Sequence, residues 1–202
     1  MGFAFHDVKS CAQALFNRAF LGSMFIFGAW FYPLPSSADT IIEAGIHLGG
    51  DELLTSQYED GRQGTIKAGE MLSFAFGPLF NMSQSWKFQT TFGVKTDAEY
   101  ATDIEVSWVR YPINATLFYA TAKTRLGIGV TYHIDPTVKG SGAASNIRQE
   151  YDDAIGYIVE FNYRRHAGFL WGLRYTFIDY ERKDSNQVAE GNSIGLLIIA
   201  HM

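Results

Sequence analysis

The feature that most constrains this chain is a strict alternation of apolar and polar side chains with a period of two, which begins near residue 40. In the first such stretch, 42–51, one face carries Ile42, Ala44, Ile46 and Leu48, and the other carries Glu43, Gly45, His47, Gly49 and Asp51. Successive side chains of a β-strand point to opposite faces, so this period predicts strands rather than helices. The chain is therefore expected to be all-β.

The same pattern recurs in eight stretches, at about residues 42–51, 65–79, 86–95, 104–119, 125–135, 155–164, 169–177 and 193–200. Short connections at 81–85, 121–123 and 165–167 alternate with mostly longer polar ones at 52–64, 97–103, 136–152 and 181–190. An even number of strands with alternating short turns and long loops is typical of single-chain bacterial membrane barrels.

The fourth stretch changes phase. Its apolar face carries even-numbered residues as far as Trp108 and odd-numbered residues from Tyr111 onward. One extra residue restores the alternation, so a β-bulge is predicted near Val109–Arg110.

The direction of the apolar face decides between a water-soluble barrel and a membrane barrel. The interior of an eight-stranded barrel is only wide enough for side chains, and the many rings of the apolar face would overfill it. The other face alternates glycines with charged and histidine side chains that can pair inside: Glu43, His47, Lys67, Lys87, Lys95, Arg110, Arg125, His133, Glu160 and Arg174. We therefore predict an eight-stranded antiparallel up-and-down transmembrane β-barrel with an apolar outer wall.

Aromatic residues near the expected strand ends fit the girdles that such barrels place at the two membrane interfaces. They are Phe80, Trp86, Trp108, Tyr119, Tyr163 and Phe169.

Residues 1–38 have the features of a cleavable signal peptide. Lys9 and Arg18 precede the uncharged apolar run 19–32, and 36–38 (Ser-Ser-Ala) supplies the small residues of a cleavage site. The run is shorter than the roughly 20 residues of a membrane-spanning helix. A retained N-terminal anchor is the alternative. The barrel is then expected at 39–202, and the single cysteine, Cys11, falls in the removed segment.

Several segments of the expected barrel resemble the outer-membrane β-barrel domain family of small eight-stranded barrels. They are AGIHLGGDEL (44–53), RYPINATLFY (110–119), RLGIGVTYHIDP (125–136), DDAIGYIVEFNY (152–163) and GLRYTFIDYE (172–181). The resemblance implies location in the outer membrane of a Gram-negative cell. It also implies periplasmic chaperones and the barrel assembly machinery as partners during biogenesis. Members of this family commonly end in an aromatic residue, whereas this chain ends in IIAHM.

Composition and motifs point to no catalytic, metal or cofactor site. A formal net charge of −5 without a clustered basic surface makes a nucleic-acid partner unexpected. Some barrels of this size modify lipid A with a His-x-Ser pair, but His133 is followed by Ile134 and Asp135. His47, His133, His166 and His201 lack metal-ligand spacing.

Cations in the expected outer loops are candidates for contact with lipopolysaccharide phosphates, because guanidinium groups bind phosphate in bidentate fashion. They are Arg62, Arg148, Arg182 and Lys183. The expected partners of the folded barrel are outer-membrane lipid and lipopolysaccharide.

The function expected from these observations is a non-enzymatic outer-membrane barrel with a structural or surface-interaction role and a lumen plugged by paired charges. A small channel, or a conduit for hydrophobic molecules, is the first alternative. For a conduit the apolar candidates in the lumen are Met71, Ile158, Leu197 and Ile199. A lipid A-modifying enzyme is the second alternative.

Overall fold

The computed structural model describes residues 38–57, 63–101, 104–142, 144–166, 168–185 and 187–202. The expected signal segment therefore lies outside the described residues, apart from Ala38, which begins the first strand. None of the described residues belongs to a helix long and apolar enough to cross a membrane.

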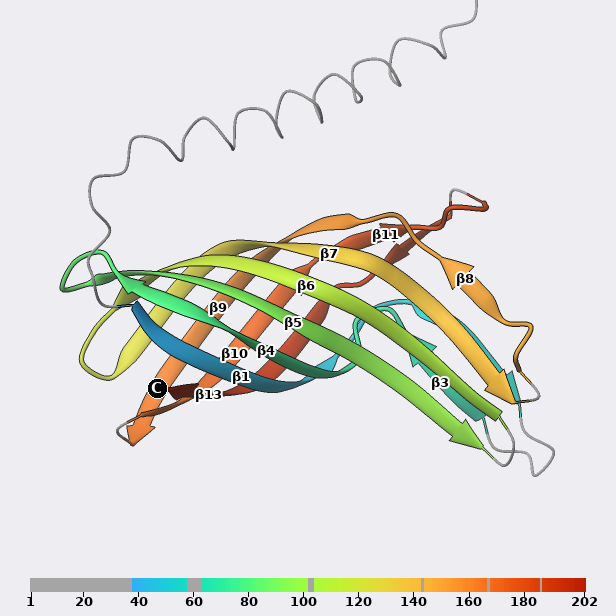
Figure 1. Ribbon diagram of the computed structural model, residues 1–202, viewed down its shortest axis with the longest axis horizontal. Coiled ribbons are helices and arrows are strands. Elements are labelled where there is room, and N and C mark those ends of the chain that lie inside the picture. Colours follow the sequence, from blue (N-terminus) through green and yellow to red (C-terminus); the bar gives the residue numbers. More distant parts are fainter. Residues whose placement is uncertain (1–37, 58–62, 102–103, 143, 167, 186) are drawn as a thin grey trace, which may run out of the picture. The chain divides into compact units, whose positions relative to one another are not determined.

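Eight strands form a closed antiparallel barrel (Figure 1). They are β1 (Ala38–Leu48), β4 (Met71–Asn81), β5 (Trp86–Ala101), β6 (Ile104–Ala120), β7 (Thr124–Gly142), β9 (Ala154–His166), β10 (Phe169–Phe177) and β13 (Ser193–His201). Each strand pairs with the next of these along the chain, and β13 pairs with β1 to close the ring. The predicted architecture is confirmed.

The two ends of the barrel differ in their connections. The short connections 82–85, 121–123 and 167–168 lie at one end, together with Ala38 and His201; we call this the turn end. The other end, the loop end, carries the β2 (Glu52–Gln57) and β3 (Gln63–Lys67) hairpin and the pair β11 (Asp179–Glu181) and β12 (Val188–Glu190). It also carries β8 (Arg148–Glu150), which pairs antiparallel with β7 at Thr137–Lys139. The connection expected at 97–103 is reduced to 102–103, because β5 and β6 continue past the barrel wall as a long hairpin.

The apolar face points outward, as predicted. In β9 the exposed residues are Ile155, Tyr157, Val159, Phe161 and Tyr163, and they alternate with buried Gly156, Ile158, Glu160 and Asn162. The same outward apolar pattern holds on β4, β7, β10 and β13. A continuous outer wall of large apolar side chains is the surface that hydrocarbon, rather than water, solvates.

The phase change predicted for β6 does not occur there. Even-numbered residues point inward along the whole strand, so Trp108 is fully buried and belongs to no interfacial girdle. The ladder does shift beside Arg110, but Val109 pairs with Thr137 and Tyr111 with Ile134, which places the extra residue on β7 at 135–136. Asp135 has a φ of 48°, and its backbone N–H donates to Asp153 Oδ1 (2.9 Å). The prediction failed because it assumed that every large apolar residue faces outward.

Two residues expected in the lumen lie elsewhere. Lys67 is in the loop-end hairpin, where its side chain is 37% exposed and its Nζ lies 3.8 Å from Glu70 Oε1. Met71, the first residue of β4, is 45% exposed. Both follow from the break at 68–70, which separates β3 from β4 where one continuous strand was expected.

Four of the predicted girdle residues, Trp86, Tyr119, Tyr163 and Phe169, are exposed at the turn end. Trp86 and Tyr119 are cross-strand neighbours whose rings meet edge to face, with centroids 5.4 Å apart. Phe80 is half-buried at the same end, and its ring stacks on that of Phe88.

Candidate functional site: the filled lumen

Apolar side chains close the lumen at the turn end. Five inward residues from four strands pack together with at most 2% exposure: Ile41, Leu79, Leu170, Leu197 and Ile199. We call this cluster the turn-end plug. The sequence contained its signal, because β13 is apolar on both faces and Leu197 and Ile199 occupy inward positions.

A charged network fills the next part of the lumen. Arg174 Nε and Nη2 lie 2.6 Å from Glu160 Oε2, and Nη2 lies 2.9 Å from Glu43 Oε2. The remaining carboxylate oxygens are also occupied: Gln89 Nε2 donates to Glu43 Oε1 (2.6 Å) and Asn162 Nδ2 to Glu160 Oε1 (2.9 Å). We call these five residues the Arg174 network. Charge-assisted hydrogen bonds of this kind satisfy groups that are costly to bury alone.

Barrel closure assembles the Arg174 network from four strands. Arg174 is directly opposite Glu160 in the β9–β10 ladder, so register alone brings those two together. Glu43 is 131 residues away in sequence and reaches Arg174 because β13 joins both β1 and β10. The pairing with Glu43 therefore depends on the closed ring.

Arg125 lies beside this network without a hydrogen-bond acceptor among the described residues, although it is 2% exposed. Its guanidinium carbon is 4.6 Å from the centroid of the Phe118 ring, which is a cation–π arrangement. Gly127 makes room for that ring, because a Cβ there would lie 2.5 Å from the Phe118 Cε1 atom. Phe118 and Gly127 together therefore hold the guanidinium in place.

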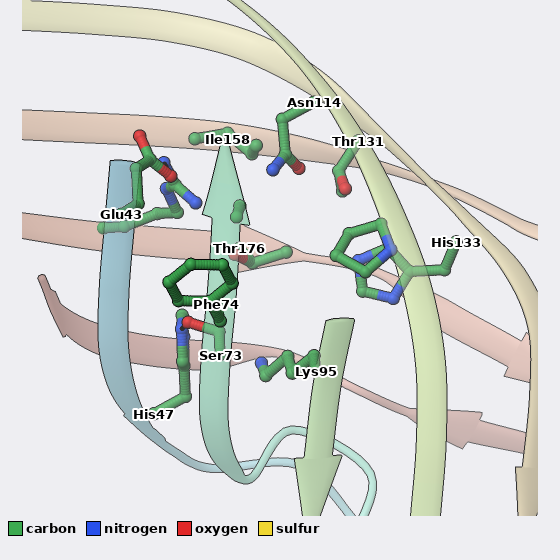
Figure 2. A pocket seen from close by; sticks show the side chains of 13 residues that line it. Glu43, His47, Ser73, Phe74, Lys95, Asn114, Thr131, His133, Ile158 and Thr176 are labelled. Atoms are coloured by element: carbon green, nitrogen blue, oxygen red, sulfur yellow. Dashed lines mark hydrogen bonds and ion pairs between the residues drawn. The ribbon is translucent and has the colours of Figure 1, made fainter. Parts of the chain in front are cut away.

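Toward the loop end, inward polar residues surround a small cavity (Figure 2). His47 Nε2 lies 2.8 Å from Ser73 Oγ, Lys95 Nζ donates to Ser193 Oγ (3.2 Å), and His133 Nδ1 lies 2.6 Å from the Tyr180 hydroxyl. The cavity volume is about 20 Å³. That is room for about one water molecule.

Aromatic residues close the lumen at the loop end. The Trp108 ring meets those of Tyr151 and Tyr180 edge to face, at centroid distances of 5.0 and 5.4 Å. Trp108 Nε1 donates to the backbone oxygen of Ala68 (3.2 Å), and the Arg110 guanidinium carbon lies 5.0 Å from the Trp108 ring. Smaller buried apolar residues complete this loop-end cap: Ile66, Ala68, Val106, Val138, Ala144, Ala154 and Ile178.

Most of the predicted interior residues are brought together by the fold. Buried in the lumen are Glu43, His47, Lys95, Arg110, Arg125, His133, Glu160 and Arg174. Lys87 is half-buried at the turn end and donates to Asn81 Oδ1. Gln89 and Asn162 were not among the predicted network residues, although the alternation places both on the same inward face as Lys87 and Glu160. The prediction also missed Tyr180, for which the sequence contains no comparable signal.

The His47–Ser73 pair was not predicted, because the β1–β4 register joins two segments that lack a shared motif. His47 Nδ1 has no hydrogen-bond partner among the described residues, so no acid orients the ring as a hydrolytic triad requires. The pair borders the 20 Å³ cavity, which cannot admit an acyl substrate. The described residues include no group of three His, Cys, Asp or Glu side chains that could hold a metal ion.

The predicted loop cations have acidic neighbours within the chain. Arg148 Nη2 lies 2.6 Å from Glu150 Oε1, and its hydrogen bond and charge lower the pKa of Glu150. Arg182 Nη2 donates to Asp184 Oδ2 (3.1 Å), and Lys183 Nζ lies 4.0 Å from Glu150 Oε2. Arg62 lies outside the described residues. Lipopolysaccharide contact through these cations stays a prediction.

No protein-family profile matches the sequence, and no curated protein matches it. Among solved structures, Ail of Yersinia pestis in complex with the heparin analogue sucrose octasulfate is similar. The two share 10% identity over 82% of this chain and 98% of that one, with a TM-score of 0.51. Neisserial surface protein A matches over 81% and 96% of the two chains at 9% identity, with a TM-score of 0.49. In strand number, closure and overall similarity, this chain has the fold of the small eight-stranded outer-membrane β-barrels.

Proposed function

We propose that this protein is a non-enzymatic barrel of the bacterial outer membrane, with a structural or surface-interaction role and a closed lumen. The outer wall supports the membrane location, because its large exposed side chains are apolar from the turn end toward the loop end. Solvent-exposed acidic residues gather at the loop end, where Asp51, Asp152, Asp153 and Asp184 are exposed. This polar end is the part that would face the medium.

The closed-lumen proposal rests on three layers of packed side chains that succeed one another inside the barrel. The turn-end plug, the Arg174 network and the loop-end cap follow one another, with a cavity of only about 20 Å³ between the last two. A water-filled ion path requires a continuous polar opening, and apolar side chains occupy both ends. A conduit for hydrophobic molecules requires an apolar middle, where the Arg174 network lies.

Planar-bilayer recording of the refolded chain 39–202 tests both the closed lumen and the membrane location. Insertion is verified first by protease protection of the barrel in phospholipid vesicles, and a known porin serves as the positive control for conductance. We expect insertion without unitary current steps. Stable unitary conductance would overturn the closed-lumen proposal in favour of a small channel, and a chain that stayed folded in buffer and ignored vesicles would overturn the membrane location.

The enzymatic alternative has a separate test. Mass spectrometry of lipid A from cells with and without the expressed protein is expected to show the same species. Loss or gain of an acyl chain that depended on Ser73 or His47 would establish a lipid A-modifying activity instead.

A further inference from the structure

Arg165 occupies a special position on the outer wall at the turn end. His166 pairs with Phe169 and Arg164 with Leu170, so Arg165 is the extra residue of a β-bulge on β9. Bulges at barrel rims redirect a side chain away from the regular alternation. Arg165 is exposed and lines a hollow in the outer wall together with Tyr163 and Trp171, which are cross-strand neighbours.

The charge around Arg165 is positive. Its neighbours along the strand, Arg164 and His166, are exposed as well. Among the described residues no carboxylate forms an ion pair with Arg165, in contrast to Arg148 and Arg182 at the loop end. This rim therefore presents free guanidinium groups beside interfacial aromatic residues.

An apolar groove begins beside Trp171, which lines both hollows. The ladders place five outward residues in one row across five strands: Trp171, Ile198, Ala44, Phe74 and Val94. Ala44 is the smallest of them, and the larger side chains of Ile46, Leu72 and Leu196 line the groove beside it. With strands about 4.8 Å apart, four spacings give a groove about 19 Å long.

The groove climbs away from the turn end. Trp171 is the third residue of β10, Ala44 the seventh of β1 and Val94 the ninth of β5, and all three strands run from the turn end to the loop end. A cationic site at the rim is thus continuous with an apolar track that rises toward the middle of the barrel. A membrane lipid has this same arrangement, with its phosphate at the interface and its acyl chain directed to the bilayer centre.

We propose that this outer-wall site binds one glycerophospholipid of the membrane leaflet at the turn end. Arg165 binds the phosphate, Tyr163 and Trp171 contact the glycerol region, and one acyl chain lies in the groove over Ala44. The surrounding positive charge favours a lipid with a net anionic headgroup, such as phosphatidylglycerol. This inference rests on the proposed membrane location.

Native mass spectrometry of the full folded barrel in detergent, titrated with palmitoyl-oleoyl phosphatidylglycerol, measures the site directly. Arg165→Gln removes the phosphate contact, and Lys123→Gln removes an equal charge at the same end but away from the groove. Ala44→Phe fills the groove, and Ala115→Phe places the same ring on the outward face of β6, between Thr90 and Val130. We expect Arg165→Gln to weaken lipid retention by about three- to tenfold, as a partly exposed charge-assisted contact implies.

The proposal requires Ala44→Phe to weaken retention as well, with Lys123→Gln and Ala115→Phe close to wild type. Equal losses in Arg165→Gln and Lys123→Gln would mean a diffuse electrostatic attraction and would overturn the site. Retention of glycerol phosphate as strong as that of the lipid would overturn the acyl-chain groove. Failure of the membrane location is distinguishable, because the wild-type chain would then not insert into vesicles at all.

Discussion

Replacing Arg174 by methionine tests the central claim that the lumen is packed and dry. Methionine has a similar length and no charge, so the change removes the cation while keeping most of the side-chain volume. The carboxylates that remain, Glu43 and Glu160, are 2% and 0% exposed. Each keeps one amide donor, from Gln89 and Asn162 respectively.

The expected cost follows from those contacts. Arg174 makes contacts of 2.6–2.9 Å to two carboxylates, and removing one member of a buried ion pair costs about 3–5 kcal/mol because the remaining charge is uncompensated. We therefore expect Arg174→Met to lower the free energy of unfolding by about 3–5 kcal/mol. An exposed pair contributes far less, so Arg182→Met at the loop end should leave the free energy of unfolding close to that of the wild type.

Urea unfolding of the barrel in phospholipid vesicles, followed by tryptophan fluorescence, measures both variants. The decisive comparison is the triple variant Glu43→Gln, Glu160→Gln and Arg174→Met. It leaves no buried charge in this network, and its amides can still bond to Gln89 and Asn162, so its stability should return to within about 1–2 kcal/mol of wild type. A single variant that loses less than about 1 kcal/mol, with no gain from the triple variant, would show a hydrated lumen and refute the reasoning.

Three further perturbations probe other parts of the molecule. Leu197→Ala leaves a cavity in the turn-end plug and should cost about 2–5 kcal/mol in the same assay, yet give no conductance, because the Arg174 network stays in place. Gly127→Ala should cost about 1–3 kcal/mol, because its Cβ displaces the Phe118 ring, and an unchanged midpoint would refute the close contact. The lowered pKa of Glu150 means that its pairing with Arg148 is complete above the carboxyl's ordinary value and is lost as pH falls through the lowered folded-state value. Amide exchange in β8 should accelerate once the pH is below that value, and Glu150→Gln should abolish this pH dependence.

Local alternation was sufficient to predict the barrel and most of the residues that form its outer wall. The side-chain direction in a strand depends only on position along that strand, so Glu43, Glu160 and Arg174 could be assigned to the interior from sequence. The alternation of short turns and long loops was also predicted, because the length of each connection equals the number of residues between two strand patterns.

The errors arose where an apolar side chain points into the lumen instead of outward. Trp108 is apolar and faces inward, because the barrel continues beyond its charged layer into the loop-end cap. The extra residue of the ladder was assigned to the wrong strand for the same reason, since a shift between two paired strands can be produced by an insertion in either one.

The sequence by itself therefore determined the eight barrel strands and the apolar face that points outward, because each of these depends on neighbours along the chain. Only the tertiary structure decided which inward residues share a level, and so which charge meets which. Closure of β13 on β1 brings Arg174 to Glu43 and bulges shift the ladders at Arg165 and beside Arg110. Those contacts depend on the stagger between strands, which a pattern of period two leaves free.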